Sequence, residues 1–201
     1  MNTAVRTVAK IKLKKAVPGQ RRQFMRFCGT LIACLSLLLL AKAGAQESQP
    51  SEYQIKAAFL FNFAKFVEWP PTSFADENSP LVIGILGDNP FSGDLERTIQ
   101  NKTINHHSLV IKQFHSLAEA RNCQMLFISA SEKKRFADIF GGLRGTSVLT
   151  VSETDGFTEA GGMINFILEN KKIRFQINDE AAKAARLKIS SKLLSVAVRS
   201  P

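Results

Sequence analysis

The sequence predicts an α/β fold: a single three-layer domain with a mainly parallel sheet, an antiparallel hairpin near the C-terminus and helices on both faces. From residue 81 onward, short apolar runs rich in β-branched residues alternate with helical patterns, which is typical of βα units. Two further apolar runs, residues 163–168 and 173–177, are separated by the polar residues 169–172 and predict the hairpin. The chain shows no internal repeat.

The first helix is expected to begin after Ser51, because Ser51 and Gln54 match a capping box. Apolar residues then recur at helical spacing through residues 53–67, and the polar positions between them include Lys56. The predicted buried face consists of Ile55, Ala58, Phe59, Phe63, Phe66 and Val67. Two prolines at residues 70 and 71 stop the helix.

The βα units follow in order along the chain. Strands are predicted over residues 81–86, 108–114, 123–128 and 147–151, and helices over residues 91–100, 117–121, 133–143 and 178–197. Residues 152–162 form a loop that leads into the hairpin. These elements predict a sheet covered on both faces.

The net charge of +10 is concentrated at the N-terminus. Nine of the 27 basic residues and none of the 17 acidic residues fall within residues 1–45, which leaves 18 basic residues against 17 acidic ones. The remaining chain is nearly neutral, so the charge predicts no nucleic-acid partner for the folded domain.

Residues 1–45 match a secretory signal peptide. A basic stretch precedes the apolar run of residues 27–41, and a small-residue cleavage pattern ends at Ala45. A permanent membrane anchor is disfavoured, because the 15-residue run is shorter than the roughly 20 residues that span a bilayer. Arg21 and Arg22 leave the twin-arginine export route open beside the general one. A lipidated Cys34 is disfavoured, because the apolar run continues past it. We therefore expect a periplasmic protein, with a linker at residues 46–51 and the α/β domain at residues 52–201.

Cleavage after Ala45 leaves Cys123 as the lone cysteine, so no internal disulfide can form. Its place at the start of an apolar run favours burial in the core, while an intermolecular bridge in a homodimer stays open as an alternative. The sequence is compatible with a monomer and with a homodimer.

Motifs for catalysis are not found in the sequence. The patterns GxGxxG, HExxH, CxxC and GxSxG are all missing, and consecutive histidines at 106 and 107 point to opposite faces of a strand. We expect no enzyme activity, no catalytic residue, no cofactor and no metal site.

Two groups of residues are candidates for binding. Asp88, Ser129 and Asp155, together with Glu153, follow predicted strands at the end of the sheet where open α/β sheets bind ligands. They predict ligand loops, although helix caps and loop carboxylates explain them equally well.

The second group predicts a partner contact on the loop and first hairpin strand. It consists of Phe157, Gly161, Gly162, Asn165 and Phe166. Phe157 is a large apolar residue among polar ones, and the diglycine permits close backbone approach. The alternative places both phenylalanines in the core and makes the glycines a simple bend.

Several segments together resemble the YfiR family of small exported proteins. They are residues 52–70 (EYQIKAAFLFNFAKFVEWP), 81–88, 123–129, 156–166 and 189–194 (ISSKLL). The resemblance implies a periplasmic repressor that binds the periplasmic sensor domain of an inner-membrane diguanylate cyclase and lowers cyclic-di-GMP. A sensor kinase is the other partner class. The family's redox-linked cysteine pairs have no counterpart here. The competing hypothesis is a periplasmic protein that binds a small molecule through the strand-end loops.

Overall fold

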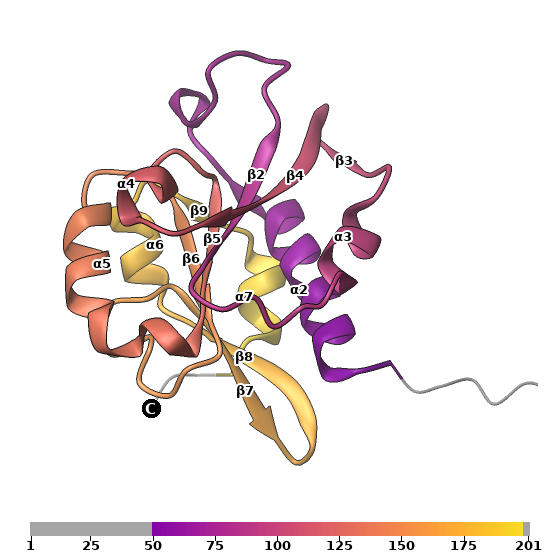
Figure 1. The fold of residues 1–201 in the computed structure, drawn as a ribbon, viewed down its shortest axis with the longest axis vertical. Helices are drawn as coiled ribbons and strands as arrows, with labels where there is room; N and C mark the ends of the chain where they lie inside the picture. Colours follow the sequence, from indigo (N-terminus) through magenta and orange to yellow (C-terminus); the bar gives the residue numbers. More distant parts are fainter. Residues whose placement is uncertain (1–49, 199–201) are drawn as a thin grey trace, which may run out of the picture. The chain divides into compact units, whose positions relative to one another are not determined.

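A computed structural model describes residues 50–198, and the main sheet in this region has seven strands in the order β3-β4-β2-β5-β6-β7-β8 (Figure 1). The strands are β2 (Leu81–Leu86), β3 (Thr103–Ile104), β4 (His107–Phe114), β5 (Met125–Ile128), β6 (Leu149–Ser152), β7 (Ile164–Glu169) and β8 (Lys172–Ile177). Neighbours in the run β4-β2-β5-β6-β7 are parallel, whereas β3 and β8 pair antiparallel at the two edges. This is a doubly wound strand order, and it confirms the predicted fold class. The predicted signal peptide lies outside the described residues.

Helices cover both faces of the sheet. One core contains side chains of α2 (Glu52–Phe66), α3 (Asp94–Ile99), α6 (Asp179–Ala184) and α7 (Ser191–Val196), and the other contains side chains of α4 (Leu117–Ala120) and α5 (Phe136–Leu143). Figure 1 shows α2 and α3 on one side of the central strands and α4 and α5 on the other. Strand β2 is buried throughout because its alternate residues enter the two cores.

Helix α2 begins as predicted, and its buried face overlaps the predicted one only in part. Ser51 accepts from the N–H of Gln54, and the Gln54 side chain accepts from the N–H of Ser51, which confirms the capping box. The buried positions are Lys56, Ala57, Leu60, Phe63 and Ala64. The predicted face is confirmed at Phe63 and Val67, Phe59 and Phe66 are partly buried and pack against the core, and Ala58 is exposed, which contradicts the prediction there. Lys56, one of the polar positions of the predicted pattern, is buried against a paired carboxylate.

The hairpin is confirmed, with a tighter turn than predicted. Strands β7 and β8 pair from Ile164↔Ile177 to Glu169↔Lys172, so the turn is only Asn170 and Lys171. Both turn residues have positive φ, at 51° and 61°, which is typical of a type I′ turn.

The predicted C-terminal helix over residues 178–197 is wrong, because the chain forms three elements there. Helix α6 is followed by β9 (Lys188–Ile189) and then by α7. Arg186 has a φ of 61° and ends α6, after which β9 pairs antiparallel with β1 (Val67–Glu68). Ser190 then caps α7 by accepting from the N–H of Leu193. Pairing between two strands that are distant in the sequence therefore takes the place of local helical hydrogen bonds. The helical periodicity of the sequence gives no indication of such pairing.

Smaller differences concern element boundaries. Helix α3 begins at Asp94, three residues after the predicted start at Phe91. The predicted helix over residues 133–143 is split into a 3₁₀ segment, η2 (Ala130–Arg135), and α5. A second 3₁₀ segment, η1 (Pro71–Ser73), and the short strands β1, β3 and β9 were not predicted.

Candidate functional site

Phe157 lies in the core, not on the surface. Its side chain is 0% exposed and packs edge-on against Phe136 and Phe140 of α5, with ring centroids 5.2 and 5.4 Å away. A Cβ at Gly162 would overlap the Phe157 ring, so this glycine makes room for the phenylalanine. The prediction of Phe157 as an exposed contact is corrected, because the loop folds its one large apolar side chain onto α5.

The other predicted contact residues are mostly buried as well. Phe166 is 3% exposed and packs against Phe63 of α2, with ring centroids 5.6 Å apart. Asn165 is also 3% exposed, and its Oδ1 has no hydrogen-bond partner among residues 50–198. Gly162 is buried, whereas Gly161 is exposed with a φ of 110°. Gly161 is therefore the one member of this group whose surface a partner can reach.

The predicted ligand loops occupy the expected end of the sheet. Asp88 is exposed, and its N–H donates to Ser131 Oγ at 3.1 Å, which links the loops after β2 and β5. Ser129 is 6% exposed and begins η2, while Asp155 is exposed on the loop after β6. Residues 50–198 form four surface grooves whose linings include none of these three residues. Their role in ligand binding stays a prediction.

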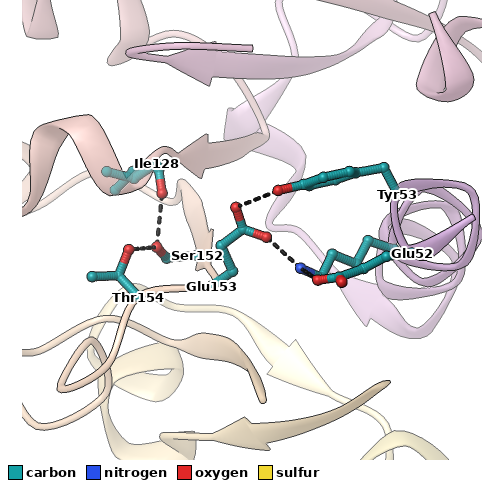
Figure 2. A network of polar contacts seen from close by, with 7 residues as sticks. Glu52, Tyr53, Ile128, Ser152, Glu153 and Thr154 are labelled. Atoms are coloured by element: carbon teal, nitrogen blue, oxygen red, sulfur yellow. Dashed lines mark hydrogen bonds and ion pairs between the residues drawn. The ribbon is translucent and has the colours of Figure 1, made fainter. Parts of the chain in front are cut away.

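A buried ion pair occupies the carboxyl end of β6, beside the first turn of α2 (Figure 2). The ammonium group of Lys56 contacts the carboxylates of Glu52 and Glu153. The side chain of Lys56 is 6% exposed and that of Glu153 is 16% exposed. Tyr53 donates its hydroxyl proton to Glu153 Oε1 at 3.1 Å, and the Lys56 ammonium lies 4.8 Å from the centre of the Tyr53 ring. We call Tyr53, Lys56 and Glu153 the α2–β6 clasp.

Residues next to Glu153 fix its backbone. Ser152 Oγ donates to the carbonyl oxygen of Ile128 at 2.7 Å and lies 3.1 Å from Thr154 Oγ1, as Figure 2 shows. Both side chains are buried. Because β6 is thereby tied to the end of β5, Glu153 is presented to α2 in a fixed position.

The electrostatics of the clasp favour a structural role over a catalytic one. Burial by itself lowers the pKa of Lys56, but the hydrogen bonds and charges of Glu153 and Glu52 outweigh it and leave the pKa above its ordinary value. Burial and the charge of Glu153 raise the pKa of Tyr53. Both groups therefore keep their protons at neutral pH, whereas a lysine base or nucleophile needs a lowered pKa. Sequence reasoning placed Glu153 at a strand end but missed Lys56, whose partner lies 97 residues away.

Cys123 is a buried, free thiol, as predicted from its apolar surroundings. It is 4% exposed, and its Sγ donates to the carbonyl oxygen of Ala120 at 3.1 Å. Burial raises the pKa of the thiol to about 12. A thiol in this state is unreactive, since the thiolate is the nucleophile.

Two large apolar side chains stand exposed within residues 50–198. Leu168 near the hairpin turn and Val196 of α7 are the large apolar residues that stand exposed, at 66% and 59%. Within this range, no three His, Cys, Asp or Glu residues lie close enough to hold a metal ion. None of the helices in this range has the length and apolar character that a membrane-spanning helix needs.

Comparisons with known proteins give a family and a fold. The family model described as YfiR/HmsC-like matches residues 53–198. A search of curated proteins gives no match. The crystal structure of a conserved domain protein from Vibrio cholerae O1 biovar El Tor str. N16961 is similar, with a TM-score of 0.51 and 11% sequence identity. The similarity covers 77% of this chain and 62% of that one, so the chain spans less than two thirds of that protein. This likeness supports the fold alone.

Proposed function

The chain belongs to the YfiR/HmsC-like family, and from that premise we propose that it is an exported, non-catalytic regulator of an inner-membrane signalling protein. In this proposal it binds the periplasmic domain of a diguanylate cyclase and holds the enzyme inactive, which lowers cyclic-di-GMP. A sensor kinase is the second partner class. The observation that carries the proposal is the match of the family model across 53–198, nearly the whole described domain.

The polar chemistry of the domain supports binding rather than catalysis. The α2–β6 clasp is closed on itself, because each charged group at its centre already has a partner of opposite charge. The thiol of Cys123, the one cysteine among residues 50–198, is buried and protonated. The described residues thus offer the regulator a rigid scaffold, and the partner would be recognised by surface loops and the hairpin.

The partner contact is proposed at the exposed parts of β7 and the segment before it. Leu168 presents an apolar side chain two residues before the hairpin turn, and Figure 1 shows this hairpin projecting beyond the rest of the sheet. Gly161 lies before the other end of β7, where its missing side chain permits close approach. An exposed apolar anchor of this kind is typical of the residues that dominate binding interfaces.

The experiment is capture of the membrane partner by the tagged protein in gentle detergent. Wild-type protein is expected to retain a membrane diguanylate cyclase or sensor kinase, identified by mass spectrometry. Leu168→Asp is expected to reduce capture while leaving the melting temperature nearly unchanged, because the side chain is largely in water. Val196→Asp is the matched control at a second exposed apolar position. Failure of the wild type to retain any signalling protein contradicts the function, and equal loss with both variants contradicts the location.

A further inference from the structure

A groove of about 570 Å³ opens at the amino ends of the parallel strands, opposite the end that bears the clasp. Its walls come from the loop before β2, from the residues just before β5 and β6, and from Arg186. This volume falls within the range of about 300–1,000 Å³ typical of small-molecule sites. The competing ligand hypothesis placed a site at the other end of the sheet, so this groove is a separate feature.

All the charged side chains that line the groove are basic. Lys112, Arg121 and Arg186 line it, and its lining, which consists of described residues, includes no aspartate or glutamate. None of the three cations forms an ion pair within residues 50–198. Three cations around one concave surface raise its potential for anions, because low-dielectric walls focus the field.

Two hydroxyl groups in the same groove are unpaired. Ser73 Oγ and Ser147 Oγ are buried and have no hydrogen-bond partner within the described part of the chain. Gln124, which is 5% exposed, also lines the groove. Its Oε1 accepts from the N–H of Val82 at 2.8 Å, and its Nε2 donates to the carbonyl oxygen of Ser73. Buried hydroxyls are almost always paired in folded proteins, so two unpaired ones on residues that line the same groove are unusual.

Arg186 is held in a backbone conformation that glycine would adopt more easily. It follows the C-cap of α6 with a φ of 61°, its N–H donates to the carbonyl of Lys183, and the next N–H, of Leu187, donates to that of Ala182. This is a Schellman motif, in which the left-handed position is usually glycine. The guanidinium group reaches the carbonyl oxygen of Gly145 at 3.1 Å on another wall of the groove. An arginine at a strained position is consistent with a use for its side chain.

We propose that this groove binds a small organic anion, a carboxylate or a phosphate monoester. The anionic oxygens lie among Lys112, Arg121 and Arg186, as in charge-assisted recognition elsewhere. The body of the ligand packs against the apolar part of the wall, which includes Phe74 and Val148. The isolated protein is expected to bind this anion, and the expectation does not rest on the proposed regulatory role.

The test is an NMR titration of the protein purified after expression of the full chain. The probes are benzoate, phenyl phosphate, inorganic phosphate and neutral benzyl alcohol. Comparison of benzoate with phenyl phosphate shows whether the groove prefers a carboxylate or a phosphate monoester. At least one of the organic anions is expected to give saturable shifts at groove amides, with a Kd below about 1 mM. Benzyl alcohol is expected to give none.

Two variants locate the site. Arg186→Gly removes the guanidinium at a position that favours glycine, so it should weaken binding about tenfold or more without lowering the melting temperature. Arg121→Gln should weaken binding similarly, and Lys134→Gln, an exposed change on η2, is the matched control. The proposal is overturned if neither organic anion saturates or if inorganic phosphate binds as tightly. It is also overturned if both arginine variants bind like the control.

Discussion

Replacement of Phe157 by alanine tests whether the loop before β7 is a core element or a contact surface. The side chain is fully buried between α5 and Gly162, so its loss leaves a cavity in the second core. Truncation of a buried phenylalanine costs about 3–5 kcal/mol of unfolding free energy. For a domain of this size, that corresponds to a fall in melting temperature of roughly 10 °C.

A double-mutant cycle with Gly162→Ala makes the reasoning specific. Alanine at 162 would place its Cβ into the Phe157 ring, and such overpacking costs about 1–3 kcal/mol in the wild-type background. In the Phe157→Ala background the ring is gone, so we expect at least about 1 kcal/mol of that cost to disappear. Gly141→Ala on α5 is the control, because a Cβ there meets nothing within 4 Å.

The assay is urea unfolding followed by circular dichroism, which gives the free energy of unfolding for all variants. The reasoning is refuted if Phe157→Ala unfolds like the wild type, or if Gly162→Ala costs the same in both backgrounds. The first result would return Phe157 to the surface as a candidate partner contact, and the second would show that its ring does not lie against Gly162.

Three further predictions concern the buried polar groups. Lys56→Met leaves Glu153 without its cation and should lower the free energy of unfolding by about 2–3 kcal/mol. This is less than the usual loss for a buried pair, because Glu153 is partly exposed. Adding Glu153→Gln should recover part of the loss. Cys123 should react with a thiol reagent at pH 8 only after unfolding, and reductant should leave the melting temperature of the monomer unchanged. Stability should fall as the pH rises from 9.0 toward 12, because the thiol of the unfolded chain loses its proton first; the Cys123 contribution to this slope is about 1.4 kcal/mol per pH unit.

Each of these predictions has a direct contradiction. A Lys56→Met protein as stable as the wild type would show that the clasp contributes nothing net to stability. A large loss of stability in reductant would reveal a disulfide between two copies of Cys123. If the stability of Cys123→Ala falls with rising pH as steeply as that of the wild type, other groups cause the loss. Lys56 and Tyr53 also have raised pKa values, which lower the stability at high pH in the same way.

Local signals in the sequence predicted the elements that depend on neighbouring residues. Ser51 and Gln54 predicted the start of α2, and the apolar run of β2 predicted a strand buried on both faces. The same reasoning failed where distant residues decide the structure. The predicted last helix is interrupted because β9 pairs with β1, more than a hundred residues earlier.

The candidate sites depended even more on distant partners. Phe157 looked exposed because its chain neighbours are polar, yet α5 and Gly162 create its pocket. Lys56 stood only as a polar position in the helical pattern, because nothing near it in the sequence identifies Glu153 as its partner. The amino-end groove combines five separate segments of the chain, so no local pattern could have predicted it.

The most direct test of the regulatory role is the cyclic-di-GMP content of cells that lack this protein. Mass spectrometry of nucleotide extracts would compare the wild type, the deletion strain and strains complemented with the full chain or with residues 46–201 alone. We predict that deletion raises cyclic-di-GMP, that the full chain restores the wild-type level, and that the chain without residues 1–45 does not. A level that is the same in all four strains would contradict the proposal that this protein represses a membrane diguanylate cyclase from the periplasm.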